Sequence, residues 1–287
     1  MQAAISSIGK FQVISTLGNG AQSIILHIRR NADGKHYALK VVPLGDAEDR
    51  KFQEQAQHEL RVAQMLEHPN LIKVHALESV RDWLFRPRKL HLLIEYVNGK
   101  TLDTVGRIPT PLLVSIFVKI AEGLVHMHRR GVFHADLKPG NIMLSKVGEV
   151  KIIDFGLAWI RGEAKGRVQG TPEYMAPEQV KMRVANEKTD IYNFGATMYR
   201  LATLRLPPNN ASGGEMSLDA KTHAQLLVPV QECNREVPME LASLIHQCLS
   251  FNPVKRPDRV SEIHGILDHL EEKVGEPTPD LVEDLDW

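Results

Sequence analysis

The sequence predicts an α+β fold in which a small, sheet-rich lobe precedes a larger, mostly helical lobe. Short runs that alternate apolar and polar positions fill residues 11–97, and a period of two is typical of half-buried strands. One helical stretch, at about residues 49–66, interrupts these runs. After residue 100 the apolar positions recur every three to four residues over long segments, which indicates amphipathic helices.

Five strands are expected in the first lobe, with turns at 18–20 and 31–34, where glycine and asparagine occur. Four helices are expected in the second lobe, and a hinge near 95–99 would join the two lobes. The expected strands are FQVISTLG, SIILHIR, HYALKVV, LIKVHAL and LHLLIEYV, and the expected helices lie near 109–130, 188–204, 239–250 and 259–272.

These boundaries predict lobes that span residues 1–97 and 98–272. The remaining residues, 273–287, contain prolines and several carboxylates but one lysine, which is typical of a solvated, flexible tail. The alternative is that the tail docks on the domain or on a partner through its apolar residues, Leu281, Leu285 and Trp287.

The composition is that of an ordinary globular protein, with 43% hydrophobic and 24% charged residues among 287. Lysine plus arginine equals aspartate plus glutamate, at 35 each, so the net charge does not favour nucleic acid as a partner. Cys233 and Cys248 are too far apart for a CxxC pair, and a reduced, cytoplasmic protein is expected. The N-terminus lacks the pattern of a secretory signal, and Lys119 and Glu122 interrupt the most apolar run, so no membrane segment is expected.

Three features of the first lobe could handle phosphate. The stretch LGNGAQSI places Gly18 and Gly20, which lack a Cβ, between two predicted strands, and Ser23 stands where such loops commonly have a third glycine. Lys40 ends the third strand, and Glu59 on the following helix could pair with it. Each feature alone has an ordinary explanation, namely a hairpin turn, a snorkelling lysine and an exposed glutamate.

A second group of candidates lies in and after the stretch VFHADLKPGNIML. Asp136 could orient a hydroxyl nucleophile or accept its proton, Lys138 could neutralise charge on a phosphoryl group, and Asn141 offers a neutral oxygen to Mg²⁺. Asp154 ends the apolar strand of KIIDFG, and a carboxylate in such a place is costly unless it is paired or binds a metal.

These features follow one another in a fixed order that ends with GTPEYMAPE at residues 170–178. On that evidence the sequence, over about residues 10–272, resembles the eukaryotic-type (Hanks-type) serine/threonine protein kinase family. DLKPGNIML together with GTPEYMAPEQ is most similar to bacterial members. The resemblance implies a bilobal protein-kinase fold and transfer of the γ-phosphoryl group of ATP to serine or threonine hydroxyls of protein substrates. It also implies Mg²⁺, with Mn²⁺ as the alternative ion, and we expect a monomer or weak dimer.

The resemblance also assigns roles to individual residues. Asp136 would orient the substrate hydroxyl, and Lys138 would contact the γ-phosphate. Asn141 and Asp154 would bind the metal, and Lys40 would hold the α- and β-phosphates. The other residues implied in ATP binding are Leu17, Gly18, Asn19, Gly20, Ala21, Gln22, Ser23, Ile25, Ala38, Glu59, Ile94 (the gatekeeper), Glu95 and Val97.

Further matches to the family pattern have structural or regulatory roles. Glu178 should pair with Arg256 and so tie the activation segment to the helical lobe. Asp190, at the start of the helix at 188–204, should bond the backbone of the catalytic loop. Thr171 matches the serine/threonine branch of the family.

The sequence departs from the family at Ala135, where most regulated members have an arginine that binds a phosphate on the activation segment. The segment LAWIRGEAKGRVQG contains no serine, threonine or tyrosine, and Arg167 occupies a frequent phosphorylation site. Because the phosphate and its receptor are missing together, we expect activity that does not depend on activation-loop phosphorylation. The alternatives are a catalytically weak pseudokinase that acts as an interaction module, and a small-molecule phosphotransferase, a class that lacks an equivalent of GTPEYMAPE.

An insertion, VRDWLFRPRKL at residues 80–90, separates the fourth and fifth predicted strands. It combines Trp83 and Phe85 with four basic residues. We expect a solvated loop whose aromatic side chains pack on the small lobe, and a partner-docking or dimerisation surface is the alternative.

Overall fold

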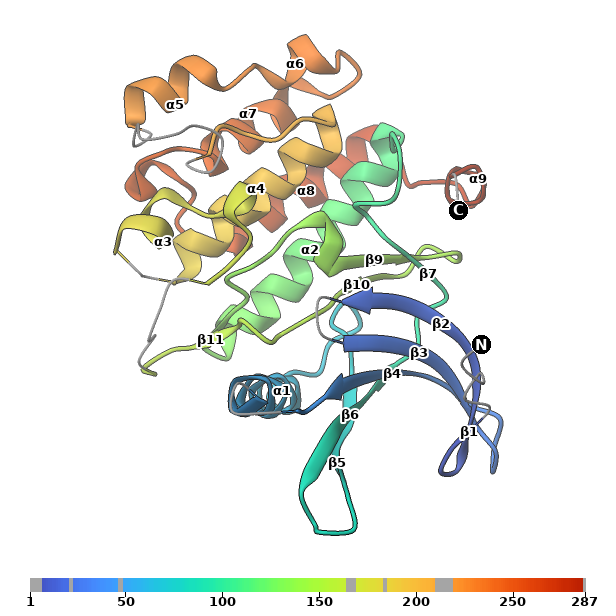
Figure 1. The fold of residues 1–287 in the computed structure, drawn as a ribbon. Coiled ribbons are helices and arrows are strands. Elements are labelled where there is room, and N and C mark those ends of the chain that lie inside the picture. The colour runs from blue at the N-terminus through green and yellow to red at the C-terminus, as the bar shows by residue number, and fades with distance from the viewer. Residues whose placement is uncertain are drawn as a thin grey trace. The chain divides into compact units, whose positions relative to one another are not determined.

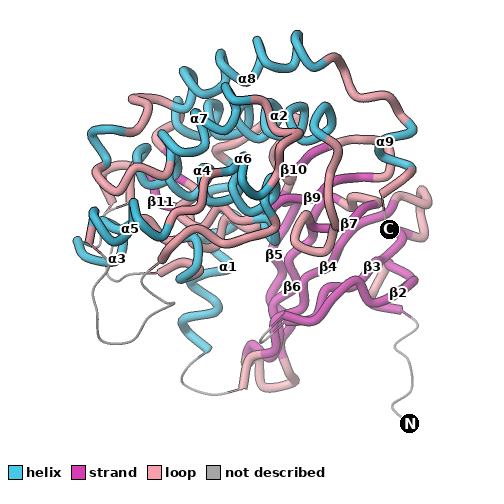
Figure 2. The backbone as a smooth tube through the Cα atoms, turned by 90° about the horizontal axis from the view of Figure 1, so that it is seen from above, coloured by secondary structure: helices cyan, strands magenta, loops and turns pink. Residues whose placement is uncertain are grey.

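The computed structural model describes residues 7–20, 23–45, 49–163, 169–182, 185–209 and 219–285. The chain divides into two compact units, which are described separately: unit 1 comprises Met1–Glu67 and Ile72–Asn98, and unit 2 comprises His68–Leu71 and Gly99–Trp287. Unit 1 is an antiparallel sheet with one helix, and unit 2 is mostly helical (Figures 1 and 2). The predicted α+β, bilobal fold class is therefore confirmed.

Unit 1 contains a six-stranded sheet in which every neighbouring pair of strands is antiparallel. The strand order is β1-β2-β3-β4-β6-β5, so β5 and β6 form a hairpin at one edge (Figure 1). The elements are β1 (Ser7–Ile8), β2 (Phe11–Gly20), β3 (Ser23–Arg30), β4 (His36–Pro43), α1 (Asp49–Gln64), β5 (Val74–Arg81) and β6 (Pro87–Glu95).

Alternate residues of β4 belong to two small cores on opposite faces of this sheet, as the period of two requires. Val42 and its cross-strand partner Leu90 pack against Ala56 of α1. Leu39, on the opposite face, packs with Ile28 of β3. The helix therefore covers one face only, and that face is the one to which Lys40 belongs.

Three predicted boundaries in unit 1 were wrong. The glycines at 18–20 do not form the turn, because β2 continues through Gly20 in register with β3. The fourth strand begins at Val74, three residues later than predicted. The insertion at 80–90 is mostly paired strand, because β5 runs to Arg81 and β6 starts at Pro87.

Unit 2 is built around four long helices whose ends lie within two residues of the predicted ones. Two small antiparallel sheets, β10-β9-β7 and β11-β8, were not predicted as sheets. The helices are α2 (Thr110–Arg129), α3 (Pro177–Met182), α4 (Glu187–Thr203), α5 (Ala220–Leu226), α6 (Val230–Cys233), α7 (Met239–Cys248), α8 (Val260–Val274) and α9 (Asp280–Glu283), and the strands are β7 (Gly99–Thr101), β8 (Val132–Phe133), β9 (Ile142–Ser145), β10 (Val150–Ile152) and β11 (Trp159–Ile160).

The helix α2 forms the centre of unit 2 and packs against α8 and α4 (Figure 1). Phe117 of α2 and Phe194 of α4 are fully buried and meet edge to face, with ring centroids 6.2 Å apart. Within the described ranges α2 alone has the length and hydropathy of a membrane span, and 67% of that window is buried inside the structure. The core helix of a globular protein is buried in the same way and meets the same criteria of length and hydropathy.

The described part of the C-terminal tail packs on unit 2. Val282 and Leu285 are 6% and 8% exposed, and the Val282 side chain approaches Gly148. The burial of Leu285 agrees with the docking alternative at that residue, and Val282, which the sequence analysis did not name, is buried as well. Trp287 lies outside the described residues.

Candidate active site

Cross-strand pairing in unit 1 aligns several residues that the family resemblance implies in ATP binding. Gly18 of β2 pairs with Ile25 of β3, which in turn pairs with Lys40 of β4. Two residues before Lys40, Ala38 pairs with Ile94 of β6. Because paired residues and residues two apart point to the same face, all five lie on the face that carries α1.

Lys40 and Glu59 form an ion pair within unit 1. Lys40 Nζ donates to Glu59 Oε2 at 2.9 Å, and Glu59 is only 3% exposed. A carboxylate at that burial is costly without a cation, so the pair links α1 to β4 and fixes the position of the ammonium group. The Lys40 side chain keeps 22% exposure.

The end of β6 carries the residues expected to meet adenine. The Glu95 N–H donates to the Lys73 carbonyl at 2.8 Å, and the Glu95 carboxylate accepts the Lys73 N–H at 3.0 Å. Val97 is 7% exposed, and within the described ranges no hydrogen bond uses its N–H. Within the described ranges this backbone donor therefore has no protein acceptor.

The glycine-rich stretch forms the end of the β2–β3 hairpin, in which Asn19 is paired and Gly20 pairs with Ser23. Leu17 is 47% exposed, and a Cβ added to Gly18 would meet no atom of the described residues within 4 Å. Among those residues, no packing contact therefore demands a glycine at position 18. Three of the predicted site residues lie outside the described ranges: Ala21, Gln22 and, in unit 2, Arg167.

In unit 2, Asp190 in the first turn of α4 binds the backbone of the catalytic loop. A capping box starts this helix, because the Asn186 side chain accepts the Thr189 N–H at 3.1 Å and the Thr189 hydroxyl accepts the Asn186 N–H at 3.2 Å. Asp190 is 0% exposed. Its Oδ2 accepts the His134 N–H at 2.8 Å and its Oδ1 accepts the Ala135 N–H at 2.7 Å. The carboxylate lies at the N-terminus of α4, where the helix dipole favours negative charge.

Asp190 has a further partner, His128 of α2, which sequence analysis did not single out. His128 Nε2 lies 2.7 Å from Asp190 Oδ2, and His128 Nδ1 lies 3.2 Å from Glu187 Oε1. Burial disfavours the charged imidazole, but the two carboxylates outweigh it and raise the pKa of His128 to about 9. Burial likewise opposes ionisation of Asp190, yet His128 lowers the pKa of this carboxyl. A local sequence signal for the pair does not exist, because its members are 62 residues apart.

Ala135 is 1% exposed and adopts the left-handed conformation, with φ of 63°. Its N–H points to Asp190, and its carbonyl accepts a hydrogen bond from Gln179 Nε2 at 2.8 Å. The same Nε2 donates to the carbonyl of Gln169 at 3.0 Å. Gln179, which sequence analysis also missed, therefore joins the catalytic loop to the activation segment with an uncharged amide.

The predicted catalytic residues converge in unit 2. Asp136 Oδ1 accepts the Thr171 N–H at 2.6 Å, while its Oδ2 accepts Asn141 Nδ2 at 3.2 Å. Lys138 Nζ lies 3.3 Å from Asp136 Oδ2 and donates to Thr171 Oγ1 at 2.5 Å. A carboxylate, an ammonium group and a hydroxyl are thereby held in one cluster.

Asn141 and Asp154 can offer hard oxygen ligands to a divalent cation. The Ile153 N–H donates to the Asn141 carbonyl at 2.9 Å, so the two residues are held on adjoining segments. The Asn141 Nδ2 donates to Asp136, so Oδ1 is the side-chain atom of Asn141 that could bind a cation, and Asp154 Oδ1 accepts the Gly156 N–H at 3.1 Å. Within the described ranges no three His, Cys, Asp or Glu residues cluster for a metal. The donor set fits Mg²⁺ that takes further ligands from phosphates and water.

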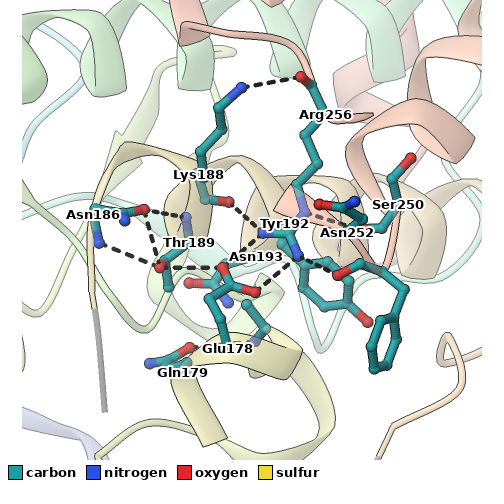
Figure 3. A network of polar contacts seen from close by, with 12 residues as sticks. Glu178, Gln179, Asn186, Lys188, Thr189, Tyr192, Asn193, Ser250, Asn252 and Arg256 are labelled. Atoms are coloured by element: carbon teal, nitrogen blue, oxygen red, sulfur yellow. Dashed lines mark hydrogen bonds and ion pairs between the residues drawn. The ribbon is translucent and has the colours of Figure 1, made fainter. Parts of the chain in front are cut away.

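The expected pair of Glu178 and Arg256 is present and deeply buried (Figure 3). Arg256 is 2% exposed, and its guanidinium donates to both Glu178 oxygens, at 2.7 and 2.9 Å. It also donates to the carbonyls of Lys188 and Ser250 at 2.8 Å and of Phe251 at 3.3 Å. The fork geometry of arginine therefore fastens α3 to the segment before α8.

The sequence of the chain is similar to those of known proteins. Residues 11–269 match the family described as the protein kinase domain. A probable serine/threonine-protein kinase of Clostridium perfringens is 26% identical over 91% of this chain and 38% of its own length. The serine/threonine-protein kinase PrkC of Bacillus subtilis is 26% identical over 90% of this chain and 40% of its own length. A probable serine/threonine-protein kinase of Streptomyces coelicolor is 30% identical over 69% and 31%, respectively. The matched part thus amounts to two fifths or less of these relatives.

Proposed function

We propose that this chain transfers the γ-phosphoryl group of ATP to serine or threonine hydroxyls of protein substrates. The chain belongs to the protein kinase family of the eukaryotic (Hanks) type, and the proposal rests on that membership. The observation that supports the proposal most is the cluster of Asp136, Lys138 and Thr171. A carboxylate and an ammonium group side by side suit a hydroxyl nucleophile and a phosphoryl group that gains negative charge.

The hydrogen bonds of Asp136 leave it able to act on a substrate. An ionised carboxylate can accept about four hydrogen bonds, and side-chain and backbone amides of the chain supply two of them. A substrate hydroxyl can take a remaining position and later give up its proton there. Lys138, at 3.3 Å from Asp136 Oδ2, would at the same time neutralise a phosphoryl oxygen.

The nucleotide would be held by groups from unit 1. Lys40, kept in place by Glu59, would contact its phosphates, and the Val97 N–H would bond to adenine. Asn141 and Asp154 would hold Mg²⁺, which when bound neutralises phosphate charge and orients the transferring group. Mn²⁺, also an oxygen-binding divalent ion, is the alternative.

We further propose that activity does not require phosphorylation of the activation segment. In a regulated kinase an arginine–phosphate contact orders this segment. Here Ala135 offers its backbone carbonyl instead, and Gln179 bridges it to Gln169. Both bonds are uncharged and internal to the chain, so they form without a modifying enzyme.

Two alternatives fit these contacts less well. A pseudokinase acting as an interaction module need not keep Asp136 and Lys138 in contact with Thr171. A small-molecule phosphotransferase has no use for the Glu178–Arg256 anchor beside the activation segment. We propose protein substrates, a cytoplasmic location and a monomer or weak dimer.

The test is transfer of radiolabelled phosphate from ATP to a generic protein substrate in the presence of Mg²⁺. Asp154→Asn should reduce transfer at least 100-fold, which is about 3 kcal/mol of lost transition-state stabilisation. Asp258→Asn, whose side chain is 82% exposed, is the matched control and should leave the rate unchanged. Equal rates for wild type and Asp154→Asn would leave the interaction module as the better description.

A second arm of the same assay addresses regulation. The chain is treated with a broad-specificity protein phosphatase and then separated from it before the assay. Unchanged transfer is expected. Loss of transfer after this treatment would contradict the proposal that the activation segment needs no phosphate.

A further inference from the structure

The turn between β5 and β6 displays three consecutive apolar side chains. Trp83, Leu84 and Phe85 are 83%, 45% and 77% exposed. The expectation that these aromatic side chains pack on the small lobe is therefore wrong. In the described part of the chain, the other exposed large hydrophobic residues are scattered, and no other three follow one another.

The turn that carries them is held firmly by Asp82. Its Oδ1 accepts the backbone N–H groups of Leu84 and Arg86, at 2.9 and 3.0 Å, and its Oδ2 accepts Arg88 Nε at 3.0 Å. The Asp82 N–H donates in turn to the Arg86 carbonyl at 2.9 Å. These four bonds give the five-residue turn a defined shape, so the exposure of the apolar side chains is not the result of a slack loop.

Phe85 adopts a left-handed backbone conformation, with φ of 59°. Large side chains avoid this region, and in turns asparagine or glycine usually occupies it. Arg81 Nη1 donates to the Phe85 carbonyl at 3.4 Å. An unfavourable conformation is thus maintained at a residue whose ring contributes little to the packing of unit 1.

Basic side chains surround this tip. Arg81, Arg86 and Lys89 are exposed and have no ion pair within the described ranges, whereas Arg88 pairs with Asp82. On β5, Glu78 lies directly opposite His91, and within the described ranges it forms no ion pair with the three cations. Among the residues that the structure describes, the tip therefore combines an apolar end with three basic side chains that form no ion pair.

We propose that this hairpin tip, residues 81–89, binds an anionic lipid surface, with Trp83, Leu84 and Phe85 in the headgroup–acyl boundary. Aromatic and aliphatic side chains prefer that depth, and arginine and lysine gain from contact with acidic headgroups. The shape of the tip favours lipid over a protein partner. A stable protein interface needs about 20–30 residues on each side, whereas this turn stands clear of the other strands and offers three apolar side chains (Figure 1). A bilayer accepts such a convex tip without a matching pocket.

The experiment is sedimentation of the full 287-residue chain with vesicles of phosphatidylcholine alone or with about 30% phosphatidylserine. Binding is expected to the anionic vesicles only and to weaken as salt rises to about 0.5 M. The double variant Trp83→Ser/Phe85→Asn should bind at least tenfold more weakly, and asparagine is chosen because it tolerates the left-handed turn. Arg86→Gln/Lys89→Gln should lose the preference for phosphatidylserine.

The matched control is Met239→Ser/Val254→Ser. It replaces two apolar side chains of unit 2 that are 66% and 81% exposed. It should bind vesicles as the wild type does, and thermal melts should show that all variants fold. No binding of the wild type, or equal binding of Trp83→Ser/Phe85→Asn, would overturn the proposal. Binding to neither vesicle, together with an oligomer that this variant dissociates, would overturn it in favour of a second copy of the chain as the partner.

Discussion

Replacement of Arg256 by alanine tests the reasoning about the buried network of unit 2 most directly. The substitution removes a guanidinium that is 2% exposed and donates to both oxygens of Glu178. It leaves this carboxylate, in a residue that is 9% exposed, without its cation. The loss of one partner of a buried ion pair costs about 3–5 kcal/mol.

Three backbone carbonyls also lose their donor, namely those of Lys188, Ser250 and Phe251. An unmade bond to a buried acceptor costs roughly 1 kcal/mol or more, although water that enters the vacated space recovers part of it. We therefore expect a destabilisation of about 5 kcal/mol. For a chain of this size that corresponds to a fall in Tm of roughly 10–20 °C.

The assay is calorimetric or circular-dichroism melting of Arg256→Ala, Glu178→Ala and the double variant. Because the two side chains contact each other, the double variant should lose much less than the sum of the single losses. Lys255→Ala, at the exposed neighbouring position, is the control and should melt within about 2 °C of the wild type. A melting temperature of Arg256→Ala as high as that of the control would show that the network does not stabilise unit 2.

Two further predictions concern the catalytic loop. Gln179→Ala leaves the carbonyls of Ala135 and Gln169 without their donor, at a cost of about 1–3 kcal/mol. Hydrogen exchange of the Thr171 N–H, which donates to Asp136, should accelerate and transfer activity should fall, and unchanged exchange would refute the bridge. For His128, the folded pKa of about 9 exceeds the unfolded value of 6.5, so its charged form stabilises the fold fully below pH 6.5. This contribution, about 3 kcal/mol, is lost as pH rises from about 6.5 through 9. His128→Gln should abolish that slope in the free energy of unfolding, and an unaltered slope would exclude His128 as its source.

The parts of the fold that follow a local pattern could be predicted from sequence. The long helices of unit 2 have regular apolar spacing, and their ends were placed within two residues. The hairpin at 80–90 was misread because charged residues and Pro87 interrupt the apolar alternation, although backbone pairing with the neighbouring strand continues. Strand pairing depends on a partner distant in sequence, so local composition underestimates it.

The residues of the candidate site also divide into those that a local motif predicts and those that it does not. The position of Asp136 or Arg256 follows from a motif with fixed spacing, and the contacts of both are present. By contrast, His128 and Gln179 are ordinary helix residues in the sequence. Their importance comes from tertiary neighbours, which are 62 and 44 positions away in the chain. Only the folded backbone reveals such partners.

The left-handed backbone of Ala135 and Asp154 limits how this chain can be made more thermostable. With φ of 63° and 64°, each residue holds a conformation that costs an ordinary L-residue about 1–2 kcal/mol. Glycine adopts this conformation freely, so an engineer who ranks positions by backbone energy would choose these two positions first. At position 135 the exchange keeps the backbone N–H that donates to Asp190. At position 154 it removes the carboxylate that is expected to bind the metal, so an active thermostable version must keep this backbone cost and gain its stability elsewhere.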